Sequence, residues 1–257
     1  MTYRAKKSLG QNFLKSEAAL RKIIEAGEIK KGDVILEIGP GKGVLTRKLL
    51  EKAGLVIAVE KDRELFEMLQ VKFSKEIESN TFMLACADIL DFNIGNYNLE
   101  AKTYKIIANI PYNITGAILK KFLTEKNQPE SMILMVQNEV ARRIVAHDGK
   151  ESILSISVKA YGEPDIIMKV PKRYFSPSPK VDSAVIAIKN ISRKIFIENN
   201  INEKKFWEIV KAGFAHKRKK LSGNLKNIIP LQNQTFKKFI DKRAEDLSLD
   251  DWVSLVK

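Results

Sequence analysis

The stretch DVILEIGPGKG, residues 33–43, decides the fold. It joins a run from Val34 to Ile38, apolar except for Glu37, to a loop with glycine at positions 39, 41 and 43. An apolar run without alternation is typical of a strand that is buried on both faces of a parallel sheet. Glycines let the backbone turn tightly and come close to a ligand. The stretch therefore predicts a strand that ends in a ligand-binding turn.

Strand-like and helix-like segments alternate around this stretch, from about residue 17 to residue 145. The predicted strands are 33–38, 55–59, 81–87, 104–110 and 131–137, and the predicted helices are 17–26, 44–52, 62–73, 114–123 and a segment ending at 145. Repeated βα units with apolar strands predict a parallel, doubly wound sheet, and hence a Rossmann-like α/β fold. In such a sheet, ligands bind beyond the carboxyl ends of the strands.

The remainder of the chain has a different pattern. Residues 153–161 are ambiguous between helix and strand, whereas 165–170 and 183–189 have strand patterns. The prolines within 175–183 predict a stiff loop without regular structure. From about residue 202 the pattern is helical and basic. We therefore expect a large domain over 1–192 and a small helical domain over 193–257.

The charge is concentrated at the two ends of the chain. The 257 residues include 45 Lys+Arg and 31 Asp+Glu, a formal net charge of +14. Residues 1–31 carry 8 basic and 3 acidic groups and residues 193–257 carry 15 and 8, whereas the 161 residues between carry 22 and 20. Basic flanks on a nearly neutral centre indicate a polyanionic partner. General solubility, or adaptation to a salty or hot habitat, is the alternative.

Cysteine and histidine are scarce. Cys86 is the only cysteine, so no intrachain disulfide is possible, which fits a reducing compartment and a cytoplasmic location. Its apolar neighbours predict a buried thiol rather than a nucleophile. His147 and His216 have no ligand spacing, so we expect no metal. We also expect no membrane segment and no signal peptide, because no apolar run is long enough.

The glycine loop does not match the common phosphate-binding patterns. Val44 stands where the dinucleotide pattern needs its third glycine, and Gly43 follows Lys42 where the phosphate loop needs Ser or Thr. A cofactor with little or no phosphate remains. Glu37, just before the loop, would repel a pyrophosphate but could accept hydrogen bonds from an ammonium group. An ordinary tight turn is the alternative.

Two carboxylates follow at the ends of the next predicted strands. Glu60, about 20 residues after the loop, is placed to accept both hydroxyls of a ribose. Asp88 could accept from an adenine amino group. Each could also be an ordinary solvated charge. A loop, a ribose carboxylate and an adenine carboxylate in this order are what S-adenosylmethionine requires.

The tetrapeptide Asn109-Ile110-Pro111-Tyr112 ends the fourth predicted strand. The Asn109 side-chain oxygen and a backbone carbonyl near Pro111 could accept the two N–H groups of an adenine amine and stabilise its developing positive charge. Tyr112 could stack on one face of the base and Phe175 could cover the other. The base would first have to leave its stack in the nucleic acid. A simple turn is the alternative.

With these residues in view, the sequence resembles the KsgA-type ribosomal RNA adenine N6-dimethyltransferases over nearly the whole chain. The resemblance is carried by residues 8–14, 37–43, Glu60, 87–89, 109–112, 135–141, 175–183 and 216–221. Asn138 departs from the family pattern, where a lysine would be expected, and puts an RNA or structural contact in doubt rather than the activity.

The resemblance implies a role for individual residues. Gln11, Asn12 and Leu14 would close over the methionine part of the cofactor, and Gly39 and Gly41 would give it backbone contacts. Glu60 would hold the ribose, and Asp88 and Ile89 the adenine. The target base would be held by Asn109, Pro111, Tyr112 and Phe175, with Asn109 also near the cofactor. Basic residues expected to contact RNA are Arg142, Arg143, Lys180, Lys217, Arg218, Lys219 and Lys220.

The family implies dimethylation of two adjacent adenosines near the 3′ end of small-subunit (16S) rRNA, within an assembling small ribosomal subunit. It implies a monomer with a catalytic domain over 1–192 and an RNA-binding domain over 193–257. One alternative is the related large-subunit methyltransferase that confers macrolide resistance. The start at 8–14 and the end at 243–249 are more similar to the small-subunit group. A non-catalytic RNA-binding assembly or transcription factor on the same fold is the other alternative.

Overall fold

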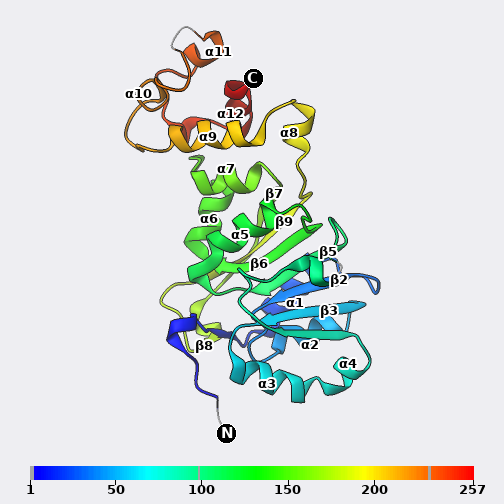
Figure 1. Ribbon diagram of the computed structural model, residues 1–257. Coiled ribbons are helices and arrows are strands. Elements are labelled where there is room, and N and C mark those ends of the chain that lie inside the picture. Colours follow the sequence, from blue (N-terminus) through cyan, green and yellow to red (C-terminus); the bar gives the residue numbers. More distant parts are fainter. Residues whose placement is uncertain (1–2, 98, 231–232) are drawn as a thin grey trace. The chain divides into compact units, whose positions relative to one another are not determined.

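The computed structural model describes residues 3–97, 99–230 and 233–257. The chain divides into two compact units (Figure 1). The first comprises Met1–Ala141 and Pro164–Ile191, and the second comprises Arg142–Glu163 and Ser192–Lys257. Residues 142–163, which the sequence placed in the first domain, therefore cluster with the C-terminal residues.

The first unit alternates strands and helices as the sequence predicts. Its described helices are α1 (Glu17–Ala26), α2 (Val44–Leu50), α3 (Arg63–Lys72), α4 (Ser74–Glu78), α5 (Thr115–Thr124) and the start of α6 (Asn138–Val145), with short 3-10 turns η1 (Lys7–Leu9), η2 (Ile94–Tyr97), η3 (Tyr112–Ile114) and η4 (Lys172–Tyr174). Its strands are β1 (Phe13–Leu14), β2 (Val34–Ile38), β3 (Leu55–Glu60), β4 (Phe82–Cys86), β5 (Tyr104–Asn109), β6 (Ser131–Gln137), β7 (Glu163–Val170), β8 (Phe175–Ser176) and β9 (Ser183–Lys189).

Seven of these strands form one sheet in the order β4-β3-β2-β5-β6-β9-β7. Strands β2 to β6 pair in parallel, which confirms the predicted βα repeat. Strand β9 is antiparallel to β6, with Met132 opposite Ile188 and Gln137 opposite Ser183. The sheet is therefore mixed rather than wholly parallel. The strand order reverses between β2 and β5, which places the carboxyl ends of these two strands at the switch point.

Helices cover both faces of the sheet. One continuous apolar cluster joins Leu20 and Ile23 of α1 and Leu49 of α2 to Ile35 and Ile107 of the sheet. Side chains alternate along a strand, so Leu36 and Ile106 point to the opposite face. Helix α5 lies on that side (Figure 1). It buries Ile118, Leu119 and Phe122. The central strands β2, β5 and β6 are buried on both faces, because helices cover both faces of the sheet there.

A second, two-stranded sheet lies outside the main one. Strands β1 and β8 pair antiparallel, with Leu14 opposite Phe175 and Phe13 opposite Ser176. The prediction that residues 175–183 lack regular structure was therefore wrong at their first two positions. Prolines begin only at Pro177, so the backbone groups of Phe175 remain available for pairing. This pairing joins the N-terminal segment to the proline-rich loop.

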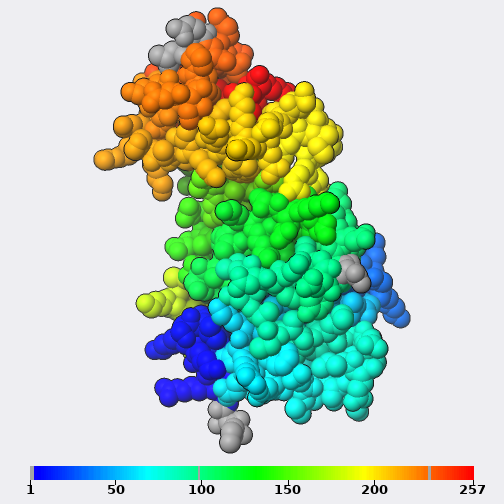
Figure 2. Space-filling model, in the orientation of Figure 1, coloured from blue at the N-terminus to red at the C-terminus, as the bar shows by residue number. Residues whose placement is uncertain are grey.

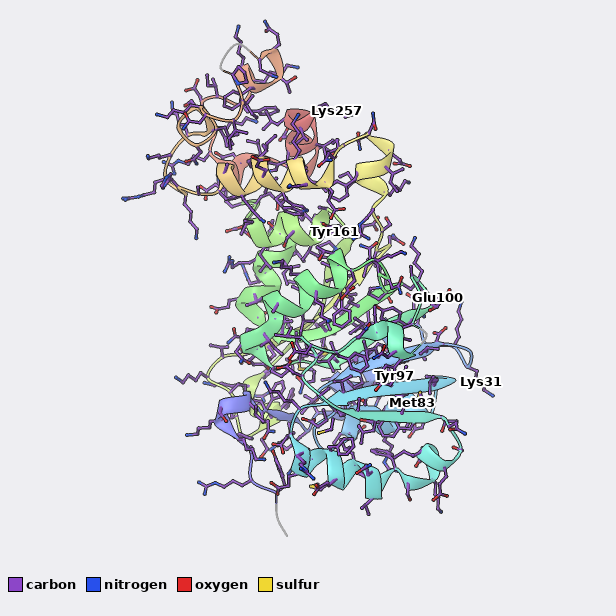
Figure 3. All side chains as sticks on the ribbon, viewed as in Figure 1. Lys31, Met83, Tyr97, Glu100, Tyr161 and Lys257 are labelled. Atoms are coloured by element: carbon purple, nitrogen blue, oxygen red, sulfur yellow. The ribbon has the colours of Figure 1, made fainter. Side chains whose placement is uncertain are left out.

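The prediction of a buried cysteine was also wrong. Cys86 is exposed. It is the last residue of β4, which is an outer strand of the sheet. Met83 of the same strand, labelled in Figure 3, is also exposed, to 43%. An apolar run in an edge strand is not covered as fully as the same run in the centre.

The second unit is helical in its described part. It contains α7 (Ile153–Lys159), α8 (Lys194–Glu198), α9 (Glu203–Gly213), α10 (Leu221–Asn224), α11 (Gln234–Lys237), η5 (Ala244–Asp246) and α12 (Leu249–Val256). The ambiguous segment 153–161 is thus mainly helical.

An aromatic cluster explains why 142–163 belong to this unit. The ring of Tyr161 (labelled in Figure 3) stacks on Trp207 at 6.1 Å between centroids and lies 5.5 Å from Phe196. The Tyr161 hydroxyl also accepts a hydrogen bond from the Trp207 indole and donates one to Glu203. These long-range contacts are not visible in the local sequence pattern.

Candidate active site

A pocket opens at the carboxyl ends of the central strands of the first unit. Its walls include residues from the loops after β2, β3, β4 and β5, and from the N-terminal segment 8–14. Twelve residues predicted for the site line it: Gln11, Asn12, Leu14, Glu37, Gly39, Gly41, Glu60, Asp88, Ile89, Asn109, Pro111 and Tyr112. Strand ends that are far apart in the sequence thus meet at one edge of the sheet, as parallel pairing requires.

The glycine loop is held by the neighbouring strand and its carboxylate. Gly41 has a φ of 59°, and its amide donates to Glu60 Oε2 at 3.0 Å. A Cβ at Gly41 would lie 3.0 Å from the ring of Phe13, so a larger residue would be crowded as well as strained. The other oxygen, Glu60 Oε1, accepts from the Asp62 amide at 2.9 Å. Two backbone amides thus fix the carboxylate while leaving lone pairs for a ligand.

Glu60 is 6% exposed. Burial raises the pKa of its carboxyl group, and the amides of Asp62 and Gly41 act in the opposite direction. A buried carboxylate that already accepts two amide hydrogen bonds is well prepared to accept a pair of hydroxyl groups.

Asp88 lies on the same wall, after β4. Its Oδ1 accepts from the Leu90 amide at 2.9 Å, and its Oδ2 forms a 2.7 Å ion pair with Lys61. The hydrogen bond from Lys61, followed by that from Leu90, lowers the pKa of Asp88. Asp88 is therefore ionised and able to accept from an amino group, with Ile89 buried beside it.

Glu37 is the least satisfied group of the pocket. It is 1% exposed, and its Oε2 has no hydrogen-bond partner among the described residues. Burial raises its pKa to about 8, and the negative charge of Glu60 acts in the same direction. A buried carboxyl group with a free oxygen is costly unless a cation or donor completes it. An ammonium group entering the pocket would do so.

At the end of β5, Asn109 is held by the N-terminal segment. Its Nδ2 donates to the carbonyl oxygen of Asn12 at 3.1 Å. Because the amide nitrogen is engaged there, the side-chain oxygen of Asn109 is the atom left to accept from a ligand. The Asn12 side chain in turn donates to the Gly10 carbonyl at 3.0 Å.

Tyr112 follows in the short turn η3 and is held by strand β9 of the same sheet. Its hydroxyl hydrogen-bonds the hydroxyl of Ser183, the fully buried first residue of β9. Burial raises the pKa of Tyr112, so the phenol is neutral. The ring is thereby fixed at the pocket wall.

Phe175 is placed differently from the other base-binding candidates. It does not line the pocket: it is 2% exposed and belongs to the apolar cluster of the sheet, opposite Leu14 in the β1–β8 pair. Its predicted stacking role is therefore not reflected in the geometry of the pocket, and it remains a prediction.

The predicted RNA-contacting residues are all at the surface. Arg142 and Arg143 of α6, Lys180 of the proline-rich loop, and Lys217, Arg218, Lys219 and Lys220 between α9 and α10 are exposed. Arg142 lies within hydrogen-bonding distance of the His147 ring, and Lys220 forms a 2.7 Å ion pair with Asp241. None of them belongs to the pocket.

Three residues next to the site have roles that the sequence did not predict. Lys61 pairs with Asp88, Ser183 holds Tyr112, and Asp62, the first residue of the predicted helix 62–73, contacts both Glu60 and the N-terminal segment. Lys61 and Asp62 follow Glu60 directly, which was an available signal. Ser183 lies 71 residues from Tyr112, and no local pattern links them.

Within residues 3–97, 99–230 and 233–257, no group of three or more His, Cys, Asp or Glu side chains could hold a metal ion. In the same ranges, no helix has the length and apolar character needed to cross a membrane.

The fold and the site define a class of protein. A Rossmann-like sheet, a glycine loop without a phosphate-binding pattern, and an Asn-Ile-Pro-Tyr turn on the same pocket are the features of a Rossmann-like methyltransferase that acts on a base nitrogen. Comparison with known proteins identifies the family within this class.

The family model of ribosomal RNA adenine dimethylase matches residues 2–257. Among curated relatives, the ribosomal RNA small subunit methyltransferase A of Dehalococcoides mccartyi is 39% identical over 261 residues, covering 99% of this chain and 88% of the relative. That of Fusobacterium nucleatum is 37% identical over 266 residues, covering 100% and 98%. Among solved structures, a dimethyladenosine transferase from Plasmodium falciparum superposes with a TM-score of 0.79 at 26% identity, covering 95% of each chain.

The chain belongs to the ribosomal RNA adenine dimethylase family. This confirms the resemblance seen in the motifs, the Rossmann-like α/β fold, and the prediction that the chain is an rRNA adenine methyltransferase rather than a non-catalytic binding protein.

Proposed function

We propose that this protein transfers methyl groups from S-adenosylmethionine to the N6 nitrogens of two adjacent adenosines near the 3′ end of small-subunit rRNA, during assembly of the small ribosomal subunit. One observation carries the proposal: Asn109 Nδ2 is engaged by the Asn12 carbonyl, which leaves the Asn109 oxygen as an acceptor in a pocket that Glu60 and Asp88 also line.

The cofactor side of the proposal rests on Glu37, Glu60 and Asp88. Glu60 would accept the two ribose hydroxyls, and Asp88, beside Ile89, would accept from the adenine amino group. Glu37 Oε2, which lacks a partner in the described structure, would accept from the ammonium group of the methionine part. Gly39 and Gly41 would offer backbone groups, and Gln11, Asn12 and Leu14 would cover the cofactor from the N-terminal segment.

The base side rests on Asn109, Pro111 and Tyr112. The lone pair of an adenine amine is delocalised into the ring, so the nitrogen is a poor nucleophile. Acceptors at the Asn109 side-chain oxygen and at a carbonyl near Pro111 would bind its N–H groups and stabilise the positive charge that develops on nitrogen. The bound cofactor would supply an activated methyl group on a sulfonium, so no strong protein base is needed. Tyr112, fixed by Ser183, would stack on the base.

The small-subunit rRNA is proposed as the substrate because of the relatives. Those from Dehalococcoides mccartyi and Fusobacterium nucleatum are both named small-subunit methyltransferases and match along nearly the whole chain. The formal charge of +14 suits a polyanion, and the exposed run Lys217–Lys220 lies in the more basic part of the chain. We further propose that residues 193–257 contribute to RNA binding, and that the protein acts as a cytoplasmic monomer without a metal.

The proposal is tested by incubating under-methylated small subunits with the protein and isotopically labelled S-adenosylmethionine, followed by mass spectrometry of the RNA. Labelled N6,N6-dimethyladenosine at two adjacent positions near the 3′ end is the expected result. Large subunits serve as the parallel substrate. Label in the large-subunit RNA alone would favour the large-subunit alternative, and label in neither would overturn the proposal.

A further inference from the structure

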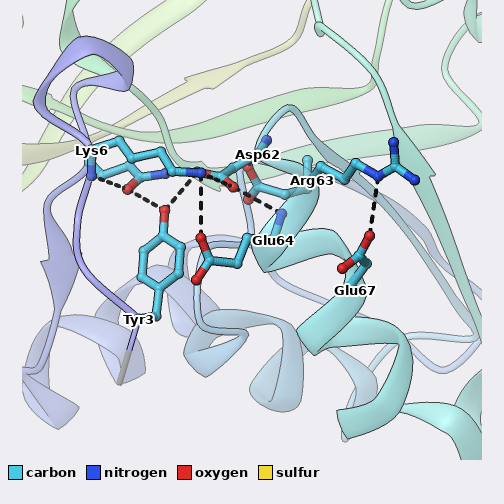
Figure 4. A network of polar contacts seen from close by, with 8 residues as sticks. Tyr3, Lys6, Asp62, Arg63, Glu64 and Glu67 are labelled. Carbon is cyan, nitrogen blue, oxygen red and sulfur yellow. Dashed lines mark hydrogen bonds and ion pairs between the residues drawn. The ribbon is translucent and has the colours of Figure 1, made fainter. Parts of the chain in front are cut away.

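Asp62 makes more contacts than its position requires. It follows β3 and caps α3, where its Oδ1 accepts from the Glu64 amide at 3.0 Å. A cap needs only one such acceptor, which Ser or Asn would supply as well. Yet the Asp62 side chain, which is fully buried, accepts hydrogen bonds from three further residues, all in the N-terminal segment (Figure 4).

These three residues are Tyr3, Lys6 and Gln11. The Tyr3 hydroxyl lies 2.7 Å from Asp62 Oδ2, and Gln11 Nε2 donates to the same oxygen at 3.0 Å. Lys6 Nζ forms a 2.8 Å ion pair with Asp62 Oδ1 and lies 3.6 Å from Glu64. Gln11 Oε1 also accepts a hydrogen bond from the Lys6 amide at 2.7 Å, so two of the residues that contact Asp62 are bonded to each other.

The segment held in this way forms part of the pocket. Residues 8–14 line it directly, and the blue N-terminal residues lie against the cyan part of the surface that contains α3 (Figure 2). The segment continues into Asn12, whose carbonyl orients Asn109. It then enters β1, which pairs with β8.

The backbone amide of Asp62 also contacts a residue of the pocket. Its amide donates to Glu60 Oε1 at 2.9 Å, and Glu60 Oε2 accepts from the Gly41 amide. One residue therefore holds the N-terminal segment with its side chain and the buried carboxylate of Glu60 with its amide.

The charge of Asp62 suits this position. Burial alone would raise the pKa of Asp62, but hydrogen bonds from Lys6, Tyr3 and Gln11, and from the Glu64 amide, together lower it to about 2. The carboxylate is ionised at neutral pH, so its bonds to the segment are charge-assisted.

We propose that Asp62 is a positioning residue that latches the N-terminal segment over the cofactor pocket, so that the contacts of Tyr3, Lys6 and Gln11 with Asp62 must break each time the cofactor enters or leaves. The inference rests on the proposed function, because it takes the pocket to be the cofactor site. Asp62 acts through Glu60 and through the segment.

The latch is tested from both of its sides. Asp62→Ser retains the helix cap but removes the partner of Tyr3 and Gln11, whereas the double variant Tyr3→Phe/Lys6→Gln opens the latch without touching α3. Each is expected to raise the dissociation constant of S-adenosylmethionine about tenfold, because a segment that is no longer held in place must be ordered when the cofactor binds. Cofactor entry and release both become faster, and release changes more. Combining all three changes adds little more, because they remove one set of contacts.

Two readouts separate the latch from a purely structural role. Amide hydrogen exchange in residues 3–12 of the cofactor-free protein becomes faster in both variants, and kcat at saturating cofactor changes less than KM for the cofactor. Arg63→Gln is the matched control, because it breaks the exposed 3.1 Å ion pair with Glu67 on the same helix (Figure 4). It leaves both readouts at the wild-type values.

A Tyr3→Phe/Lys6→Gln protein with wild-type cofactor affinity and wild-type hydrogen exchange would overturn the latch proposal. This variant tests the proposal even where Asp62→Ser folds poorly. The two proposals fail in different ways. If the wild-type protein binds no S-adenosylmethionine, both the proposed function and the latch proposal are wrong. If the wild-type protein and the latch variants bind the cofactor with equal affinity, only the latch proposal is wrong.

Discussion

The two sides of the pocket are built by different means. On the cofactor side, backbone amides from the same or an adjacent strand end hold the carboxylates: Glu60 is held by the amides of Gly41, 19 residues away, and of Asp62, and Asp88 by the amide of Leu90. On the base side, side chains are held by distant segments: Asn109 by Asn12, 97 residues away, and Tyr112 by Ser183, 71 residues away. The cofactor side is therefore built mainly by backbone amides of adjacent strand ends, whereas the base side depends on side chains held by segments much further away in the sequence.

This difference implies that the two sides can be damaged separately. Removing a cofactor-side group is expected to weaken cofactor binding, and removing a base-side group is expected to slow methyl transfer at saturating cofactor. The largest expected effect is on the base side.

Asn109→Ala is expected to lower kcat by about 100-fold, because removing one donor or acceptor that stabilises developing charge has an effect of that size. Rapid-quench measurement of labelled methyl transfer to small subunits gives this rate. Asn113→Ala is the matched control, since Asn113 also lines the pocket but is not part of the proposed chemistry. Equal methyl-transfer rates for the two variants would mean that Asn109 has no specific role in the reaction.

Glu60→Ala is expected to raise the cofactor dissociation constant by about 10- to 100-fold, because hydrogen bonds to a charged group contribute about 1.5–3 kcal/mol each. RNA affinity should remain nearly unchanged. Isothermal titration of both ligands checks this. An equal loss of both affinities would contradict a role confined to the cofactor side.

Ser183→Ala tests whether a distant anchor orients the base-side ring. It should lower kcat by about tenfold while leaving the cofactor dissociation constant unchanged, since a misplaced group costs rate rather than cofactor affinity. Tyr112→Phe should give the same loss, and the double variant no more than either single change. Fully additive losses would mean that the two hydroxyls act independently.

The basic run between α9 and α10 is expected to affect neither side of the pocket. Changing Lys217, Arg218 and Lys219 to Gln should lessen the slope of log affinity against log salt by about 2, at about 0.7 per phosphate contact of single-stranded RNA. Filter binding across a salt series measures the slope. An unchanged slope would mean that other residues make the contacts with RNA phosphates.

Glu37 gives the smallest effect, a dependence on pH. Its folded pKa of about 8 lies above the ordinary glutamate pKa of 4.5, so the folded protein binds the extra proton between these values and loses stability as pH rises from about 4.5 to 8. An ammonium ligand favours the carboxylate, so cofactor binding should release a proton below pH 8 and tighten as pH rises towards 8. Titration in buffers of different ionisation enthalpy measures the release, which Glu37→Gln should abolish.

The same difference between the two sides explains what the sequence could predict. The glycine loop, Glu60 and Asp88 were recognisable because each follows an apolar strand, and parallel strands bring their ends together. The helix from Glu17 to Ala26 and the strands Ser131–Gln137 and Ser183–Lys189 were predicted with their observed bounds, since their apolar patterns are strong.

What the sequence could not predict depends on contacts between distant segments. The antiparallel pairing of β9, the β1–β8 pair and the burial of Phe175 arise from how the chain returns to the sheet. The hydrogen bond between Tyr112 and Ser183 and the latch at Asp62 have the same origin. Local periodicity carries no information about such pairings.

The most direct test of a preformed cofactor side is isothermal titration of the RNA-free protein with S-adenosylmethionine. We expect binding of one cofactor per chain without RNA, retained in Asn109→Ala to within a few-fold and weakened in Glu60→Ala. Cofactor binding that requires RNA, or that Glu60→Ala leaves intact, would contradict this expectation.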